Sequence, residues 1–146
     1  MNVLVINGPN LNMLGIREPS IYGSQSYSAL VEFIEKSAMA IGMDATVRQS
    51  NHEGVIVDWI QAAYGEFDGI VINPAAYTHT SVAILDALKA IKPVPAIEVH
   101  LSNVNSREEF RHVSYAGMAC EKTFAGYGFD SYRLALQCLH ELIRGR

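Results

Sequence analysis

Residues 69–91, with the sequence GIVINPAAYTHTSVAILDALKAI, contain the pattern that decides the fold. The first five residues form an almost continuous apolar run, which is typical of a parallel β-strand that is covered on both faces. From Thr80 to Ile91 the apolar residues recur at helical spacing, and Pro93 ends the pattern. The stretch therefore predicts a buried strand, then a polar loop, then an amphipathic helix.

The same alternation of strand and helix recurs on both sides of this stretch. Short apolar runs predict further strands at 2–7, 44–49 and 96–100, with a weaker one near 118–125. Helical spacing predicts further helices at 27–41, just after 50–53, near 106, and from 130 to about 144. The first of these helices lies between Ser26 and Gly42, which are suitable caps. Two others begin with the pattern of a capping box, Ser50 with Glu53 and Ser106 with Glu109.

Five such repeats in 146 residues, with no linker composition between them, predict one domain over residues 1–146. Connections that are long enough to hold helices predict that neighbouring strands are parallel. We expect an α/β fold, a three-layer α/β/α sandwich of the flavodoxin-like kind. Its five-stranded parallel sheet should have the order 2-1-3-4-5, a choice that rests on length and repeat count.

Composition narrows the classes of partner and site. The 11 Lys and Arg against 15 Asp and Glu give a net charge of −4, so we expect no nucleic acid and no membrane surface as partner. No apolar run approaches the ~18 residues that cross a bilayer, and the first residues lack a secretory signal, which predicts a cytoplasmic protein. The two cysteines and five histidines lack metal-ligand spacing, so we expect no metal and no disulfide framework. Small molecules are the favoured partners.

Polar side chains follow the predicted strands at the end where open α/β sheets bind ligands. Asn10 follows the first strand, Asn73 ends the third, and Thr78-His79-Thr80-Ser81 precede a helix. Either asparagine alone has a structural explanation as a turn residue. A helix cap explains the threonines and the serine but leaves His79 unexplained. The coincidence of these residues at strand ends favours a binding site.

The fourth strand and the residues after it carry groups suited to acid–base chemistry. Glu98 and His100 are two positions apart on a strand and share a face, so the carboxylate can orient the imidazole directly or through water. A core histidine with its hydrogen bonds satisfied remains an equal alternative. Ser102 follows as a donor for a carboxylate, whereas Arg107 and Arg111, four apart, fit either an anion site or a solvated helix face.

The connection at 8–25 is long for a βα loop, and loops of this length are often lids or binding loops. It matches neither G-x-G-x-x-G nor G-x-x-x-x-G-K-[ST], which disfavours dinucleotide and P-loop functions. It holds Arg17 five residues before Tyr22. The spacing alone favours a structural explanation, a solvated arginine and a tyrosine at the edge of the core.

Four segments of the chain together resemble the type II 3-dehydroquinate dehydratases, enzymes of the shikimate pathway. The segments are NGPNLNMLGIREPSIYG (7–23), RQSNHEG (48–54), INPAAYTHTSVAILDAL (72–88) and IEVHLSNVNSREEFRHVSY (97–115). The resemblance implies a flavodoxin-like fold and an anti elimination of water from 3-dehydroquinate, giving 3-dehydroshikimate through an enolate. It also implies that no cofactor, metal or Schiff base takes part.

The resemblance implies roles for the catalytic residues as well. Tyr22 would be the base that takes the proton beside the ketone, and Arg17 would support its ionised form. His100 would protonate the departing C1 hydroxyl, oriented by Glu98. Asn10 would hold the water that stabilises the enolate oxygen.

For substrate binding, the resemblance implies contacts around the carboxylate and the ring hydroxyls. Asn73, Ser102 and the N–H of Leu101 would lie around the carboxylate and the C1 hydroxyl, and His79 and Arg111 would meet the ring hydroxyls. Asp86 would reach a neighbouring subunit's site. This role implies a homo-oligomer, the family's dodecamer built from trimers.

The sequence departs from the family pattern at a few positions. Ala75 stands where many members have glycine, which could narrow the pocket floor, and 120–122 and 130–132 differ in type. Two alternatives therefore stay open. One is a flavodoxin-like module that binds a nucleotide or a flavin without catalysis. The other is a family member that has kept the fold and lost the activity.

Overall fold

The structure is a computed structural model that describes residues 1–16 and 25–146. Within these residues five strands are formed: β1 (Asn2–Asn7), β2 (Asp44–Gln49), β3 (Gly69–Asn73), β4 (Ala96–His100) and β5 (Lys122–Ala125). They form one sheet in the order β2-β1-β3-β4-β5, and each neighbouring pair is parallel. The predicted fold class and strand order are confirmed, and the first four strands have the predicted bounds.

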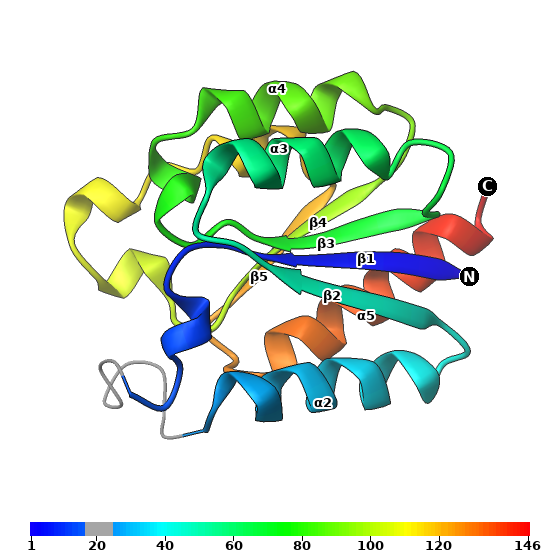
Figure 1. Ribbon diagram of the computed structural model, residues 1–146, viewed down its shortest axis with the longest axis horizontal. Coiled ribbons are helices and arrows are strands. Elements are labelled where there is room, and N and C mark those ends of the chain that lie inside the picture. Colours follow the sequence, from blue (N-terminus) through cyan, green and yellow to red (C-terminus); the bar gives the residue numbers. More distant parts are fainter. Residues whose placement is uncertain (17–24) are drawn as a thin grey trace.

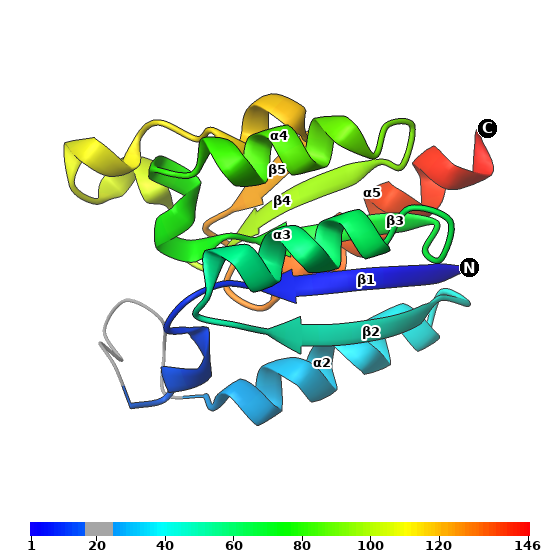
Figure 2. The same ribbon diagram turned by 45° about the horizontal axis from the view of Figure 1, so that its top comes forward.

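Helices cover both faces of this sheet and complete three layers. The described α-helices are α2 (Tyr27–Met39), α3 (Glu53–Ala62), α4 (Val82–Ala90) and α5 (Asp130–Arg144). Figure 1 shows α3 and α4 on one face of the sheet and α2 and α5 on the other, and Figure 2 shows the same layers from a second side. None of the helices among the described residues is long and apolar enough to span a bilayer.

The sheet divides the apolar core into two parts. Alternate residues of a strand face opposite sides, so Val3 and Val5 of β1 pack toward α2 and α5, whereas Leu4 and Ile6 pack toward α3 and α4. Because each central strand serves both cores, its apolar residues run without interruption, and Ile70, Val71 and Ile72 are fully buried. The apolar runs seen in the sequence therefore place the sheet at the centre of the molecule.

Some predicted element starts are wrong, and short polar side chains explain why. The Ser50 hydroxyl accepts a hydrogen bond from the His52 N–H at 3.0 Å, so α3 begins only at Glu53 and the capping box predicted there does not form. The helix predicted near Ser106 is replaced by two 3₁₀ turns, Val104–Ser106 and Glu109–Arg111, so its capping box is also absent. Such local bonds from serine and asparagine compete with a helix.

The caps of α2 and α4 follow the expected chemistry more closely. Ser26 accepts a hydrogen bond from the Ala29 N–H at 3.2 Å, as predicted for the start of α2. Ser81 accepts from Ile84 N at 2.9 Å, so α4 begins at Val82 rather than at Thr80. A 3₁₀ turn, Ala75–His79, occupies the residues before it. This turn carries His79 to the carboxyl end of the sheet.

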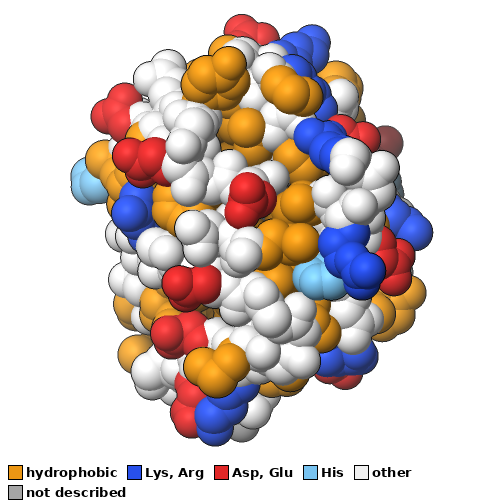
Figure 3. Space-filling model, turned by 90° about the vertical axis from the view of Figure 1, so that its right-hand side faces the viewer, with side chains coloured by type: hydrophobic (Ala, Val, Ile, Leu, Met, Phe, Trp, Pro, Cys, Tyr) orange, Lys and Arg blue, Asp and Glu red, His pale blue; other side chains and the backbone are white. Residues whose placement is uncertain are grey.

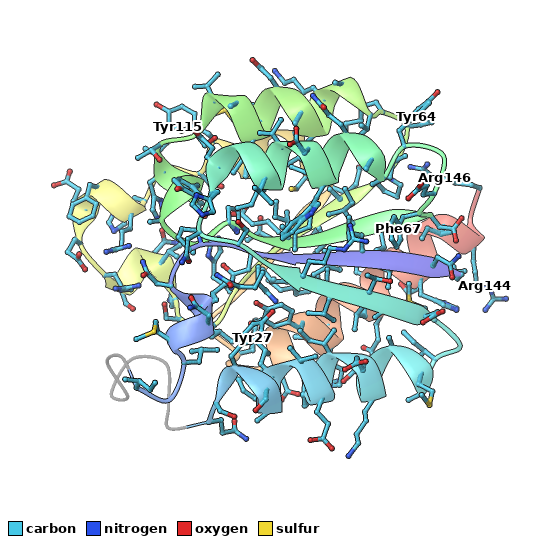
Figure 4. All side chains as sticks on the ribbon, in the orientation of Figure 1. Tyr27, Tyr64, Phe67, Tyr115, Arg144 and Arg146 are labelled. Carbon is cyan, nitrogen blue, oxygen red and sulfur yellow. The ribbon has the colours of Figure 1, made fainter. Side chains whose placement is uncertain are left out.

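A buried tyrosine of α5 joins the two central strands. Asn7 and Asn73 are register partners at the carboxyl ends of β1 and β3. The Tyr132 hydroxyl donates to Asn7 Oδ1 at 2.6 Å and accepts from Asn73 Nδ2 at 2.9 Å. Asn7 Nδ2 in turn donates to the hydroxyl of Tyr27, which lies at the start of α2, at 3.3 Å (Figure 4). These bonds satisfy both ends of the Asn7 amide and one N–H of the Asn73 amide in the interior.

Replacing Tyr132 with phenylalanine will therefore destabilise the fold. Tyr132→Phe removes the hydrogen bonds to Asn7 Oδ1 and from Asn73 Nδ2 in the interior, and we expect a loss of about 2–4 kcal/mol in the free energy of unfolding. Urea denaturation measures it. Tyr64→Phe is the matched control, because Tyr64 is 63% exposed and lies at the opposite end of the sheet (Figure 4). Equal stability of the two variants would contradict the prediction.

Candidate functional site

A pocket opens at the carboxyl ends of β1, β3 and β4, the edge of the sheet that the sequence predicted. Its empty volume is about 670 Å³ including the open mouth. Seven predicted site residues line it: Asn10, Asn73, His79, His100, Leu101, Ser102 and Arg111. The fold thus gathers residues from three strand ends and the connections after them, which are far apart in the sequence.

Among the described residues, two other predicted site residues, Glu98 and Asp86, do not line this pocket. Glu98 lies behind His100 and is only 1% exposed. Asp86 is exposed on α4, away from the pocket of its own chain. Arg17 and Tyr22 lie outside the described residues, so their predicted roles stay predictions.

The predicted pair on β4 is formed. His100 Nε2 lies 2.6 Å from Glu98 Oε2, and both side chains are buried. Burial alone would raise the pKa of Glu98, but the hydrogen bond from His100, with others from Ser114 and Thr123, holds this pKa below its usual value. An ionised carboxylate therefore stands behind the imidazole, and the imidazole faces the pocket.

His79 presents one defined nitrogen to the pocket. Its Nδ1 lies 2.7 Å from the carbonyl oxygen of Val113, which can only accept, so Nδ1 carries the proton. Burial lowers the pKa of His79, and this favours the neutral ring. In the neutral ring Nε2 is an acceptor, which suits a hydroxyl group of a ligand.

The loop after β1 is held against the neighbouring strand ends. Asn10 has φ 69°, a left-handed conformation that asparagine tolerates, and its N–H donates to Asn51 Oδ1 at 3.0 Å. Gln49 Nε2 donates to the Gly8 carbonyl at 3.1 Å. A Cβ on Gly8 would lie 2.5 Å from the Pro74 carbonyl oxygen, so only glycine lets the two loops approach this closely. Gln49 and Asn51, which the sequence analysis did not include in the site, thus hold Asn10 in place.

The pocket is electrostatically suited to an anion. Among the described residues, its lining includes Arg107 and Arg111 and no carboxylate. Glu108 lies outside the lining and accepts from Arg111 Nε at 3.1 Å, while the Arg111 guanidinium lies 5.1 Å from the centre of the Phe110 ring. These contacts fix the guanidinium at the pocket wall, from where it can bind a carboxylate or a hydroxyl. Arg107 was noted in the sequence but was not predicted as a site residue.

The opposite end of the molecule has a different character. Figure 3 shows this face, at the amino ends of the strands, with acidic and basic side chains scattered among neutral and apolar ones. A nucleic-acid site would need basic side chains gathered on one surface. Among the described residues, no group of three or more His, Cys, Asp and Glu side chains is placed to hold a metal ion.

Ala75 adopts a strained conformation at the pocket floor. Its φ is 53°, in the left-handed region, and its N–H donates to Asn73 Oδ1 at 3.1 Å. A side chain in this region costs about 1–2 kcal/mol relative to the right-handed one, whereas glycine adopts it freely. A glycine at this position would remove the strain.

We therefore expect Ala75→Gly to raise the free energy of unfolding and Ala76→Gly to lower it. Both alanines belong to the same 3₁₀ turn, but only Ala75 has a positive φ. The extra chain entropy of glycine lowers stability at both positions by about 0.5–1 kcal/mol, and only at Ala75 is it offset. Urea denaturation should place Ala75→Gly about 1–2 kcal/mol above Ala76→Gly in unfolding free energy. A lower stability for Ala75→Gly would show that the position is not strained.

Comparison with known proteins gives the family. The family model described as "Dehydroquinase class II" matches residues 1–140. A 3-dehydroquinate dehydratase of Lachnospira eligens is 52% identical over 143 residues, 97% of this chain and 97% of that protein. One of Caldicellulosiruptor bescii is 54% identical over 142 residues, again 97% of each chain.

A solved structure agrees in the fold as well as in the sequence. The crystal structure of the type II dehydroquinase from Butyrivibrio crossotus superposes with a TM-score of 0.94 at 51% identity, covering 96% of this chain and 97% of that one. The resemblance noted in the sequence is thereby confirmed. Because the family model matches nearly the whole chain and the fold superposes on a solved member, the chain belongs to the class II dehydroquinase family.

Proposed function

We propose that the protein catalyses the dehydration of 3-dehydroquinate to 3-dehydroshikimate, as a hydro-lyase of the shikimate pathway or of quinate breakdown. The observation that carries this proposal is the buried Glu98–His100 pair at the end of a pocket lined by two arginines. An elimination of water needs a proton donor for the leaving hydroxyl, and the substrate's carboxylate needs cations. Relatives that are about half identical bear the name of this enzyme.

The first step in the proposed mechanism removes a proton from the carbon beside the ketone. Tyr22 acts as the base in its phenolate form, and Arg17 supports that form through its positive charge. The electron pair of the C–H bond moves to the carbonyl and gives an enolate. Asn10, at the pocket mouth, holds a water that donates a hydrogen bond to the enolate oxygen; a donor placed in this way is typically worth about 3–4 kcal/mol.

The second step expels the C1 hydroxyl on the opposite face. The enolate collapses, the C1–O bond breaks, and His100 gives its proton to the departing oxygen so that water leaves. Glu98, ionised behind the ring, stabilises the protonated imidazole until that moment. Base and acid are thus a phenol and an imidazole in separate environments, which lets each be tuned on its own.

Substrate binding follows from the donors and acceptors at the pocket wall. Asn73 Nδ2 uses one hydrogen for Tyr132 and keeps a second for the substrate, beside Ser102 and the N–H of Leu101. These groups bind the carboxylate and the C1 hydroxyl. His79 Nε2 and Arg111 bind the ring hydroxyls, since one accepts and the other donates.

The proposal extends to the assembly. Asp86 is exposed on α4 and is free of any role in its own chain's pocket, which fits a contact with a neighbouring subunit's site in a dodecamer built from trimers. Sedimentation velocity tests this part. A particle of a single 16.0 kDa chain at working concentrations would rule it out.

A direct assay tests the activity itself. Adding 3-dehydroquinate to the folded protein should produce the ultraviolet absorbance of the conjugated enone in 3-dehydroshikimate. No gain in absorbance, from a sample whose circular dichroism shows it folded, would refute the proposed function.

A further inference from the structure

Among the described residues, the carboxylate of Glu98 has three polar partners, of which only His100 belongs to the same strand. Ser114 Oγ donates to Glu98 Oε2 at 2.8 Å, and Thr123 Oγ1 donates to Glu98 Oε1 at 2.8 Å. His100 Nε2 lies 2.6 Å from Oε2. Both carboxylate oxygens are therefore occupied in a buried position.

The direction of these bonds follows from the neighbouring groups. Ser114 Oγ accepts from the Gly117 N–H at 2.9 Å, so its own hydrogen is left for Glu98. Thr123 likewise donates. With donors on both oxygens, Glu98 is in the form that only accepts, and His100 Nε2 must carry the proton between them. The other ring nitrogen, Nδ1, is then the one left for the pocket.

The segment that carries Ser114 is fitted closely to this carboxylate. A Cβ on Gly117 would lie 2.5 Å from Glu98 Oε1 and 2.8 Å from Ser114 Oγ, so only glycine leaves room for the bond between them. The next residue after Ser114 is anchored as well, because the Tyr115 N–H donates to the Thr78 carbonyl at 2.9 Å. On the other side, Thr123 is the register partner of Glu98 in the β4–β5 pairing. Two separate elements therefore hold the same side chain.

We propose that Ser114 and Thr123 are positioning residues of the catalytic site, which keep Glu98 ionised and turned toward His100. Neither residue lines the pocket, so neither contacts the substrate. Ser114 and Thr123 affect turnover only through Glu98 and His100. This part of the inference rests on the proposed function. Their effect on Glu98 itself is independent of any reaction.

Other titratable groups around Glu98 do not explain its ionised state. Besides His100, these are His79 from the turn after β3 and the Cys120 thiol beyond Gly117. Burial lowers the pKa of His79, so this ring adds no charge near neutrality. Burial and the charge of Glu98 raise the pKa of Cys120 to about 12, so this thiol stays neutral. Besides the hydrogen bond and charge of His100, the two hydroxyl donors support the ionised carboxylate.

The test is a pH titration of Glu98 by ¹³C NMR in the intact protein, with the signal assigned by Glu98→Gln. Ser114→Ala and Thr123→Val each remove one donor to a charged group, and each should raise the pKa of Glu98 by about 1–2 units. Thr78→Val is the matched control, because Thr78 is buried but its Oγ1 has no hydrogen-bond partner. Thr123→Ser keeps the donor and should restore the titration of the parent protein.

Turnover gives a second readout. In Ser114→Ala and Thr123→Val the acidic limb of kcat should move toward neutral pH by the same 1–2 units, while KM changes less than about twofold. A Glu98 pKa equal to that in Thr78→Val would overturn the positioning roles. Absence of dehydration by the parent protein would instead refute the proposed function, and the NMR titration would still decide the roles of Ser114 and Thr123.

Discussion

Replacing His100 with asparagine will lower kcat for 3-dehydroquinate by about 10²- to 10⁴-fold, the usual contribution of a positioned acid or base. The amide can still donate to Glu98, so the buried carboxylate keeps a partner and the fold stays intact. What is lost is the proton for the departing hydroxyl. We therefore expect KM to change much less than kcat, as measured from the enone absorbance at several substrate concentrations.

His140→Asn is the matched control for this variant. His140 lies in the second half of α5, next to Leu139, which packs against Gly69 at the amino end of β3. The same substitution there removes a histidine at the far end of the sheet from the pocket, and kcat should stay within about twofold of the parent. A His100→Asn enzyme that turns over as fast as His140→Asn would exclude His100 as the acid.

Tyr22→Phe should have an effect of the same size for a different reason. The substitution removes only the phenolic oxygen that takes the proton, and we expect kcat to fall by about 10²- to 10⁴-fold while substrate binding persists. A free phenol with a pKa near 10 is only about 0.1% ionised at pH 7, so this base depends on the charge of Arg17. Calorimetric titration with substrate measures the binding, and the enone assay measures the rate.

Tyr64→Phe again serves as the control, since this tyrosine is exposed and lies far from the pocket. The prediction for Tyr22 rests on the family relationship, because this residue is outside the described part of the chain. Near-normal kcat in Tyr22→Phe would mean that another group takes the proton. A loss of binding together with turnover would make Tyr22 a binding residue instead.

The sheet could be predicted from the sequence because two local signals, an apolar run and a polar residue at its end, indicate its central strands. In the central strands an apolar run such as 69–73 defines the strand, and a polar residue such as Asn73 marks its end. The same alternation placed Glu98 and His100 on one face, and the structure confirms their contact. These features could be predicted because the residues that form them, such as Glu98 and His100, lie within a few positions of each other in the sequence.

Features that depend on distant residues could not be predicted in this way. Ser114 and Thr123 lie 16 and 25 positions from Glu98, and nothing in their local sequence indicates this partner. The 3₁₀ turns at 104–111 were predicted as a helix, because side-chain bonds such as that from Asn105 N to Asn103 Oδ1 leave no periodic signal. Gln49 ends a predicted strand and Asn51 lies in a predicted capping box, so neither indicates a site residue before the loop after β1 is seen against them.

The hydrogen bond from Tyr132 to Asn7 joins residues 125 positions apart, which affects how the chain folds while it is being translated. On a ribosome, β1 and β3 emerge long before α5, so the pocket amide of Asn73 lacks its hydrogen bond to Tyr132 until almost the whole polypeptide has been made. Leu136 and Leu139 of the same helix cover apolar residues of β3 and β4, which would otherwise remain open to water. A nascent chain is therefore unable to bind its substrate productively before its last helix docks, and the final segment to be translated is the one that completes the site.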